Sequence, residues 1–518
     1  MQRRDFNLLL QRSALALALT PWTQAMAEPV AQRISWRTQP FALGVASGRP
    51  RSDSLVLWTR LLLRADDAHL ANQALPVEIE VFVDAALKQR VQVHTITTNA
   101  VRGHSVHAQL KNLKPATDYW YRFRCGDAFS AIGHARTAPA LNADVQQLRL
   151  ALTSCQNFEH GLYVAHQEIA KEPLDFVLFM GDYIYESNNP QTLPRKHNNE
   201  EPKTLAQYRT RYEQYKADPM LQASHAAHTW VLMWDDHEVV NDYANDQDRN
   251  YTDPQVFLQR RAAAYQAYFE HQPVLIAPDP KRPYDMRLYD NFCWGQLADV
   301  WTLDCRQYRS AQACRDPLRG GGRMITQCSE LDDAQRTMLG FEQERWLHDS
   351  LSVSQASWKL LAQATQISST SVPAPTGRAY WNDAWDGYPQ ARKRLLQTVI
   401  DAGLKNVVTL GGDVHMNIAA NLRQEPNNPD SPVVASEFVG TSISSRGMGE
   451  KAMSLIRSSN PDLLHARADE RGYSLITVTP EMLRCDFKTT ATPAGSEAGF
   501  KTQASYAVYR DKVGPQPL

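Results

Sequence analysis

The chain has 518 residues, of which 43% are hydrophobic and 21% charged, and its formal net charge at pH 7 is -1. This length predicts two or more domains with a large core, and the composition is that of an ordinary globular protein. The near-zero charge argues against a stable nucleic-acid partner, and beyond the N-terminus no apolar run predicts a membrane span in the mature chain.

Residues 1–27 resemble an export signal. Arg3 and Arg4 lie in the segment QRRDFNL, which is similar to the twin-arginine consensus, and a short, weakly apolar region follows. Ala25-Met26-Ala27 then forms an A-x-A cleavage site. We therefore expect a periplasmic or secreted protein that the twin-arginine translocase exports. A disordered cytoplasmic leader is the alternative.

Residues 28–140 have the pattern of an all-β domain. Segments 55–58, 77–83 and 91–94 alternate apolar and polar residues with the period of a half-buried strand. Segment 113–123 resembles the fibronectin type III signature, in which a Tyr near the start of a strand bonds back to the preceding corner. We predict a small β-sandwich of the fibronectin III or immunoglobulin-like kind, followed by a linker near 136–147.

From residue 148 to 518 the pattern changes to strands that alternate with helices. The expected strands are 148–153, 175–180, 229–233, 358–364, 406–410, 433–439 and 473–487. Helices are expected at 162–170 and 391–402, and the polar stretch 187–210 is expected to be a surface loop. Because 358–364 and the C-terminal strands lack regular helical crossovers in the sequence, we predict a mixed α/β sheet rather than a doubly wound one.

A polar cluster directly follows four of the apolar runs. The clusters are Ser154-Cys155-Gln156, Gly181-Asp182-Tyr183-Ile184-Tyr185, Trp234-Asp235-Asp236-His237-Glu238 and Gly411-Gly412-Asp413-Val414-His415. A buried strand delivers the loop at its C-terminal end to one edge of a sheet, where ligands can meet. Cys, Asp, Tyr and His form the set that binds metal ions and hydrolyses phosphate esters, so we expect the four clusters to form one metal site.

The first two clusters offer iron ligands. Cys155 ends its strand, where a thiolate would bind iron strongly, although a buried inert Cys is the alternative. Asp182 and Tyr185 are three residues apart, so a turn can aim a bridging carboxylate and a hard phenolate at one ion. Gly181 would permit a tight backbone approach. An N-cap Asp followed by a buried Tyr is the alternative.

Asp413 and His415 have the D-x-H spacing of ligand pairs in hydrolytic metal sites. In an extended segment both side chains would face the same side, and the preceding glycines would let a metal or substrate approach the backbone. A satisfied core pair is the alternative.

The cluster at 235–238 places three acids and one imidazole in four residues. Such a group needs compensating cations or helix N-terminal amides. His237 could hold the transferring phosphoryl oxygens or protonate the leaving group. An acidic helix N-terminus would explain the acids but not the histidine. Elsewhere, Cys314 and Cys328 flank a glycine-rich loop and could form a disulfide or remain free thiols.

Taken together, these motifs resemble the PhoD-like alkaline phosphatases of the calcineurin-like metallophosphoesterase superfamily. The resemblance covers almost the whole mature chain and includes segments 44–48, 57–60 and 304–309 beside the four clusters. It implies a mixed-sheet metallophosphoesterase sandwich that uses Fe(III) and Ca(II). Where the wider superfamily has D-x-H and G-H-x-H, this chain has Ser-Cys-Gln and Gly-Asp-Val-His, as the PhoD-like branch does.

The resemblance also implies roles for single residues. Iron would be surrounded by Cys155, Asp182, Tyr185 and His415. Asp182 would bridge to calcium, and Asp236 and Asp413 would supply further oxygen ligands. His237 would take the position of the catalytic histidine. Asp235, Asn241 and Arg306 are candidates to support the ligands or contact substrate; Arg306 or Arg446 could clamp a phosphate oxygen, with a surface salt bridge as the alternative for both.

The predicted reaction is hydrolysis of phosphate monoesters, diesters or both by a metal-activated water. The expected partners are phosphate-ester small molecules, or diesters derived from phospholipids or nucleotides. The alternatives are a phospholipase D-type phosphodiesterase and a non-catalytic periplasmic protein that binds phosphate or calcium.

Overall fold

The structure is a computed structural model that describes residues 34–191, 193–491 and 499–518. The predicted export signal at 1–27 lies outside these residues. None of the helices in the described part of the chain combines the length and apolarity that crossing a membrane requires.

The largest sheet has ten strands and joins the N-terminal part of the chain to the rest. In spatial order its strands are β25 (Gln516–Pro517), β24 (Lys501–Tyr509), β23 (Met482–Thr490), β22 (Arg471–Val478), β9 (Leu148–Thr153), β10 (Phe176–Met180), β11 (Thr229–Met233), β1 (Val45–Gly48), β2 (Leu55–Arg60) and β5 (Ser105–Leu110). Strands β9, β10 and β11 are parallel to one another. Ser47 of β1 pairs in parallel with Thr229 of β11, so the N-terminal strands extend the same sheet.

A seven-stranded sheet contains much of the C-terminal half. Its strands are β12 (Asp290–Trp294), β13 (Ala298–Leu303), β15 (Trp358–Gln363), β18 (Val407–Gly411), β20 (Val433–Val439), β19 (Asn417–Arg423) and β21 (Leu463–Arg467). Strands β13, β15, β18 and β20 are parallel, whereas β12, β19 and β21 pair antiparallel to their neighbours. Helices α6 (Phe341–Ser352) and α7 (Pro389–Asp401) are the connections on either side of β15. The expectation that this strand lacks helical crossovers was therefore wrong, because α6 had not been recognised in the sequence.

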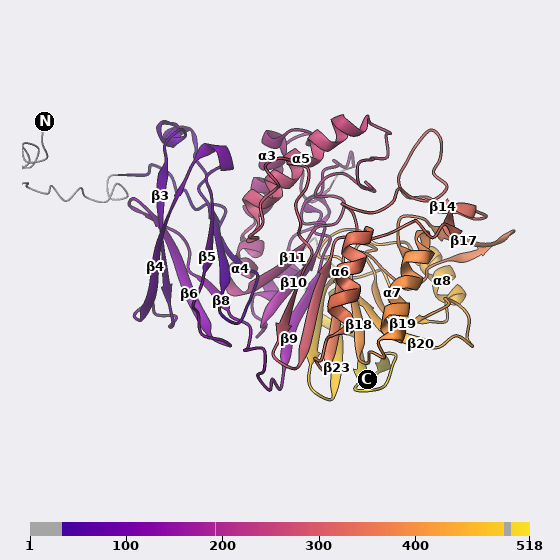
Figure 1. The fold of residues 1–518 in the computed structure, drawn as a ribbon. Helices are drawn as coiled ribbons and strands as arrows, with labels where there is room; N and C mark the ends of the chain where they lie inside the picture. Colours follow the sequence, from indigo (N-terminus) through magenta and orange to yellow (C-terminus); the bar gives the residue numbers. More distant parts are fainter. Residues whose placement is uncertain (1–33, 192, 492–498) are drawn as a thin grey trace, which may run out of the picture.

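The two sheets face each other across one core, and helices cover the far side of the smaller sheet. Leu360 and Ala362 of β15 point into the core that also holds Leu178 of β10. Leu361, between them, packs instead with residues of α6 and α7. This alternation is what a strand buried on both faces requires. Figure 1 shows α6 and α7 in front of β18 and β19. The predicted mixed α/β architecture is confirmed.

The N-terminal strands form a β-sandwich, drawn in indigo and violet in Figure 1. A five-stranded sheet consists of β4 (Arg90–Thr98), β3 (Leu75–Phe82), β6 (Asp118–Cys125), β7 (Ala128–Phe129) and β8 (Gly133–Arg136). Its inner residues share a core with β2 and β5. The Tyr119 hydroxyl accepts a hydrogen bond from the backbone N–H of Lys114, 2.8 Å away, so this Tyr bonds back to the corner as expected. The fibronectin-like assignment and the domain boundary stay predictions.

The remaining α-helices of the described residues are α2 (Val164–Ile169), α3 (Leu205–Lys216), α4 (Pro219–Ala227), α5 (Pro254–His271) and α8 (Glu450–Ser459). Among them, helices α2 to α5 contribute side chains to the core of the ten-stranded sheet. A three-stranded sheet contains β14 (Met324–Ile325), β17 (Gly377–Trp381) and β16 (Val372–Ala374). Short 3-10 helices are η2 (Ala65–Leu70), η3 (Ala100–Arg102), η4 (Phe158–His160), η5 (Ser329–Asp332) and η6 (Trp385–Gly387).

Two expected segments differ from the structure. The stretch predicted as a loop at 187–210 ends early, because α3 begins at Leu205 behind a capping box formed by Thr204 and Gln207. The single strand expected at 473–487 is a hairpin of β22 and β23. Pro480 lies in the turn of this hairpin. Because turn residues form no hydrogen bonds between the two strands, the missing N–H of proline does not weaken their pairing. Cys314 and Cys328 form a disulfide, one of the two states left open by the sequence.

Candidate metal centre

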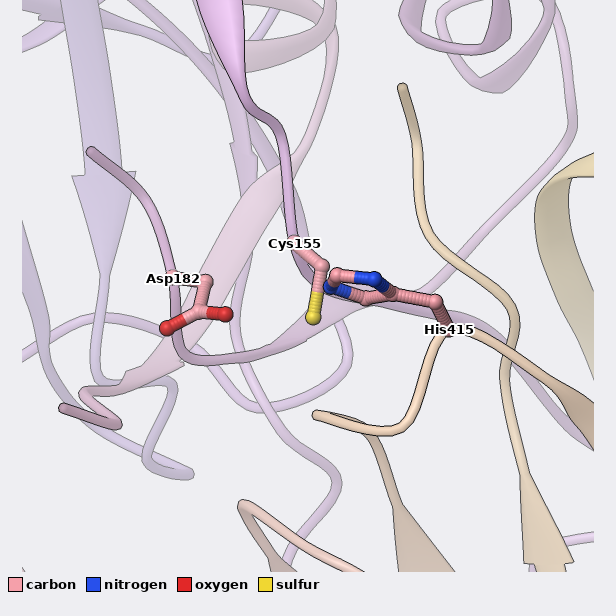
Figure 2. A group of neighbouring side chains, drawn as sticks. All are labelled: Cys155, Asp182 and His415. Atoms are coloured by element: carbon pink, nitrogen blue, oxygen red, sulfur yellow. The ribbon is translucent and has the colours of Figure 1, made fainter. Parts of the chain in front are cut away.

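The four polar clusters meet, but at the ends of strands from two sheets rather than one. Cys155, Asp182 and Asp235 follow β9, β10 and β11 of the ten-stranded sheet, and His415 follows β18 of the seven-stranded sheet. Because the sheets face each other, the C-terminal ends of their parallel strands converge. Figure 2 shows the side chains of Cys155, Asp182 and His415 directed toward one another from separate loops.

The loops that carry these residues are held in left-handed backbone conformations. Cys155, Asp182, Asp413 and His415 have φ values of 59°, 57°, 65° and 55°. Non-glycine residues with positive φ are uncommon and gather at functional sites. Backbone bonds join the first two loops, since Cys155 N–H donates to the Gly181 carbonyl at 3.1 Å and Gln156 N–H donates to the Asp182 carbonyl at 3.1 Å. The ligand-like side chains are thus fixed by their own main chain.

Two glycines in the clusters serve the protein's own packing. A Cβ at Gly181 would lie 2.5 Å from the backbone nitrogen of Asp235, and a Cβ at Gly412 would lie 2.7 Å from Oγ of Ser154. The tight backbone approach expected at Gly181 is confirmed. At Gly412, where the sequence suggested that a metal or substrate approaches, the glycine likewise lets one site loop cross another at close range.

The residues expected around iron lie together. The sulfur of Cys155, a carboxylate oxygen of Asp182 and a ring nitrogen of His415 are all within 4.8 Å of one another. The Tyr185 hydroxyl lies 2.8 Å from Oδ2 of Asp182 and 3.1 Å from Nε2 of His415. The Ser445 hydroxyl, which the sequence did not indicate, is 2.8 Å from the Tyr185 hydroxyl. A thiol, a carboxyl, a phenol and an imidazole therefore face one small volume.

A second group of side chains shares Asp182. Ligand atoms of Asp182, Asp236 and His237 lie within 4.8 Å of one another. Oδ1 of Asp182 and Oδ1 of Asp236 are both buried, and within the described residues neither accepts a hydrogen bond. An unpaired buried carboxylate oxygen is costly unless a cation or donor satisfies it. These two orphaned oxygens fit a site that holds metal ions.

The protonation states of the cluster point the same way. Burial and the carboxylate of Asp182 raise the pKa of the Cys155 thiol well above its usual range. Burial likewise raises the pKa of Asp182. Burial lowers the pKa of His415 to about 3, so its imidazole is neutral. Without a cation, the Cys155 thiol and the Asp182 carboxyl would stay protonated. With a cation bound, the thiolate, the carboxylate and the neutral imidazole become a favourable ligand set.

The tautomer of His415 suits a ligand. Its Nδ1 lies 2.7 Å from the backbone carbonyl of Arg446, which can only accept, so Nδ1 carries the proton. Nε2, which faces Tyr185, is left with a free lone pair. Metal-binding histidines are commonly oriented by such a bond from the other ring nitrogen.

His237 is held at the rim of the cluster by two partners. Its Nδ1 lies 2.6 Å from Oε2 of Glu186, and its ring stacks on Tyr185 with centroids 4.0 Å apart. Burial alone would lower the pKa of His237, but Glu186, Asp182 and Asp236 raise it well above its usual value. Oε1 of Glu186 accepts from the backbone N–H of Asn241 at 3.0 Å. Within the described residues the Asn241 side chain itself makes no hydrogen bond, so a role for it stays a prediction.

Arg306 is buried in an ion-pair network and not at the surface. Its guanidinium contacts both carboxylate oxygens of Asp235, with Nη2 2.9 Å from Oδ2, and Nη1 lies 2.6 Å from Asp383. Nη1 is also 3.5 Å from Asp236. The side chain is 1% exposed, so the surface salt bridge considered for Arg306 was wrong. With its donors directed at these carboxylates, Arg306 braces the ligand loop, and a contact between Arg306 and phosphate stays a prediction.

Asp413 is oriented differently from the expectation. Residues 413–416 form bends rather than an extended segment, so Asp413 and His415 do not alternate as in a strand. Oδ2 of Asp413 accepts from the Thr365 hydroxyl at 2.9 Å and lies 3.8 Å from Arg306. It belongs to none of the three groups of ligand atoms found among the described residues. Its role as a metal ligand stays a prediction.

No helix begins at the acidic cluster of the third loop, where the described residue 236 forms a bend and residues 237–239 form a turn. Glu238 accepts from the backbone N–H groups of Tyr183 at 2.6 Å and Asp235 at 2.9 Å, so it ties two site loops together. Arg306 supplies the compensating charge for its neighbours. The alternative of an acidic helix N-terminus was therefore wrong.

Several site residues were missed from the sequence. Asp242 and Asp383 come within 4.8 Å of Asp236 and form a third group of carboxylates. Asp383 follows a strand of the small sheet and carries no cluster of ligand types around it. Glu186 directly follows Tyr185 and could have been included with its cluster. Arg446, by contrast, was a candidate from the sequence; it is exposed, and its Nη1 donates to Oε1 of Gln191 at 3.1 Å, so a contact with phosphate stays a prediction.

Comparisons with known proteins cover almost the whole chain and agree with one another. The family model described as "PhoD-like phosphatase" matches residues 150–487, and the model "PhoD-like phosphatase, N-terminal domain" matches residues 25–139. The chain is 40% identical over 511 residues to alkaline phosphatase D of Bacillus subtilis (strain 168), covering 97% of this chain and 86% of that protein. A solved structure described as "Structure of PhoD" is similar at a TM-score of 0.87 and 39% identity, covering 94% of this chain and 93% of that one.

Proposed function

The chain belongs to the PhoD-like phosphatase family and is a phosphoric ester hydrolase, and on this premise we propose that it hydrolyses phosphate monoesters and diesters at a metal centre. The observation that supports the proposal most is the convergence of Cys155, Asp182, Tyr185 and His415 on one volume. The family assignment disfavours the alternative of a non-catalytic binding protein.

The residues at this centre fit metal ions of two kinds. Cys155, Tyr185 and His415, with Asp182, offer sulfur, phenol, imidazole and carboxylate donors that suit Fe(III). Asp182 and Asp236 each have a buried carboxylate oxygen that accepts no hydrogen bond, and a hard cation such as Ca(II) binds oxygens of this kind. Held by these residues, such cations would neutralise phosphate oxygens and lower the pKa of a bound water, so that it could act as the nucleophile. The assignment of Fe(III) and Ca(II), and of Asp413 as a further ligand, rests on the resemblance.

The chain's own residues then supply the rest of the chemistry. His237 is held by Glu186 through Nδ1, so its other nitrogen faces away from that carboxylate. Because neighbouring carboxylates raise its pKa, His237 carries two protons and can donate to a phosphate oxygen or to the departing alkoxide. Arg306 fixes the side chain of Asp235, and Glu238 fixes the backbone N–H of the same residue. The side chains of the site therefore need little rearrangement when substrate binds.

Turnover and metal content test this function together. Purified protein should hydrolyse p-nitrophenyl phosphate, bis-p-nitrophenyl phosphate or both, lose the activity with a chelator, and regain it when calcium is restored. Activity that survives complete removal of metal, with no metal found by elemental analysis, would contradict the proposal. A preference for one ester would settle the choice between phosphatase and phospholipase D-type phosphodiesterase.

Export rests on the sequence alone. We infer that the twin-arginine route carries the folded protein to the periplasm or the medium, with Arg3 and Arg4 as its signal. A double change of these arginines to lysine should retain the protein in the cytoplasm. Unchanged export of that variant in cell fractionation would contradict the inference.

A further inference from the structure

An apolar pocket lies close to the metal centre, because Val414, which precedes His415, and Ala384, which follows Asp383, are among its lining residues. It has a volume of about 400 Å³ and lies between the small sheet, the loop after β18 and helix α8. Apart from Thr370 and Asp413, every residue that lines it is apolar. In Figure 1 the small sheet and α8 lie together at the end of the molecule opposite the β-sandwich.

The pocket leaves large apolar side chains in solvent. Met324 and Trp381 on the small sheet are 46% and 40% exposed, and Met448 and Leu455 at helix α8 are 43% and 49% exposed. Single exposed apolar residues are normal, but a group that lines one hollow marks a binding surface. Met and Trp side chains adapt to apolar ligands of irregular shape.

The wall of the pocket is fixed before any ligand arrives. Met324 pairs with Trp381 across two antiparallel strands. Gly322 packs so closely on the indole that a Cβ there would lie 2.5 Å from its Cζ2 atom. Gly322 belongs to the loop closed by the disulfide of Cys314 and Cys328, so this loop holds the indole in place. A site formed in advance binds its ligand with little loss of conformational freedom.

Charge decides what kind of group the pocket can hold. Asp413 lines it at the end nearest the metal centre, and its carboxylate accepts from Thr365 and lies near Arg306. Within the described part of the chain no Lys or Arg lines the pocket. A phosphate group would therefore have no cationic partner there. An uncharged apolar group joined to a phosphate at the metal centre meets no such penalty.

We propose that this pocket binds the apolar ester group of the substrate, so that the enzyme selects phosphate esters of hydrophobic alcohols. The proposal rests on the proposed function, which places the phosphate at the metal centre. Each methylene that enters such a pocket can improve binding up to about fourfold. Leu455 and Trp381 contact the ester group in this account, and neither belongs to the metal centre.

Alkylphosphonates test the pocket because the carbon–phosphorus bond that joins their single alkyl chain to the phosphonate is not hydrolysed. Inhibition of p-nitrophenyl ester hydrolysis should be measured for methyl-, butyl- and hexylphosphonate. We expect the inhibition constant to fall about tenfold or more from methyl to butyl, since three methylenes are added. In the variant Leu455→Asn the dependence on chain length should weaken. Leu141→Asn is the matched control, because Leu141 is also exposed and lies outside the pocket.

The outcomes separate this proposal from the proposed function. If p-nitrophenyl esters are hydrolysed but inhibition does not strengthen with chain length, the pocket proposal is overturned and the proposed function stands. If Leu455→Asn and Leu141→Asn behave alike, the pocket is likewise not the binding site. If no ester is hydrolysed, the proposed function fails first. A dimer of the unmodified protein that Leu455→Asn dissociates would assign the pocket to a second copy of the chain and overturn the proposal.

Discussion

The pair of Glu186 and His237 offers a test of the proposed catalytic acid. Glu186→Gln keeps the size of the side chain, and its one amide oxygen can accept from Nδ1 of His237, while the amide NH2 then takes the place of the oxygen that accepts from the Asn241 N–H. It removes the charge that raises the pKa of His237 and that, with the imidazolium, makes the 2.6 Å contact a charge-assisted hydrogen bond. Such bonds contribute about 1.5–3 kcal/mol, against about 0.5–1.5 kcal/mol for neutral ones.

The difference of about 1–1.5 kcal/mol predicts how far the reaction slows. Each 1.36 kcal/mol corresponds to a tenfold change in rate, so the variant should hydrolyse an ester with a poor leaving group about tenfold more slowly. An ester of p-nitrophenol should be affected much less, because its anion leaves without a proton. The assay compares kcat for p-nitrophenyl phosphate with kcat for an alkyl phosphate in both proteins.

Glu159→Gln is the matched control for this test. Glu159 is also buried, accepts from the backbone N–H of Asn189 and lies 3.7 Å from a ring nitrogen of His197. The control should leave the ratio of the two rates unchanged. An equal loss on both esters in Glu186→Gln, or no loss on either, would refute the assignment of His237 as the proton donor to the leaving group.

Two further predictions concern stability. Arg306→Gln leaves the buried Asp235 and Asp383 without their cation and should lower the free energy of unfolding by about 3–5 kcal/mol in urea denaturation. As a control, Arg467→Gln removes an ion pair with Asp469 in which both side chains are exposed, and it should cost under about 1 kcal/mol. Equal losses in the two variants would contradict the buried network. Changing Cys314 and Cys328 together to serine opens a loop with a sequence separation of 14 and should lower the free energy of unfolding by about 3 kcal/mol. An unchanged melting temperature would mean that other contacts hold the loop.

The strand ends of the site could be predicted because their signal is local. In each case an apolar run is followed within five residues by Cys155, Asp182, His237 or His415. One short segment therefore predicts both the strand and the candidate ligand after it. The four ends therefore converge as expected once the strands are parallel. The convergence of two sheets, with His415 coming from the second, could not be derived, since no local pattern states which sheet a strand joins.

The parts that the sequence analysis missed depend on contacts distant along the chain. The pairing of Ser47 with Thr229 merges the N-terminal sandwich into the main sheet, and nothing near either residue indicates the other. Asp383 reaches the site through Arg306, which is equally distant in sequence. Helix α3 was missed for a local reason. Buried charged residues such as Arg211 obscure its apolar face in the sequence, although its capping box of Thr204 and Gln207 could have marked its start.

Elemental analysis of the purified protein tests the central claim most directly. In the unmodified chain we expect iron and calcium, and in Cys155→Ser we expect the bound iron and the phosphatase activity to fall together, because the sulfur lies within 4.8 Å of donor atoms of Asp182 and His415. Normal iron content in the variant would remove Cys155 from the ligands. Active, unmodified protein without any metal would contradict the account as a whole.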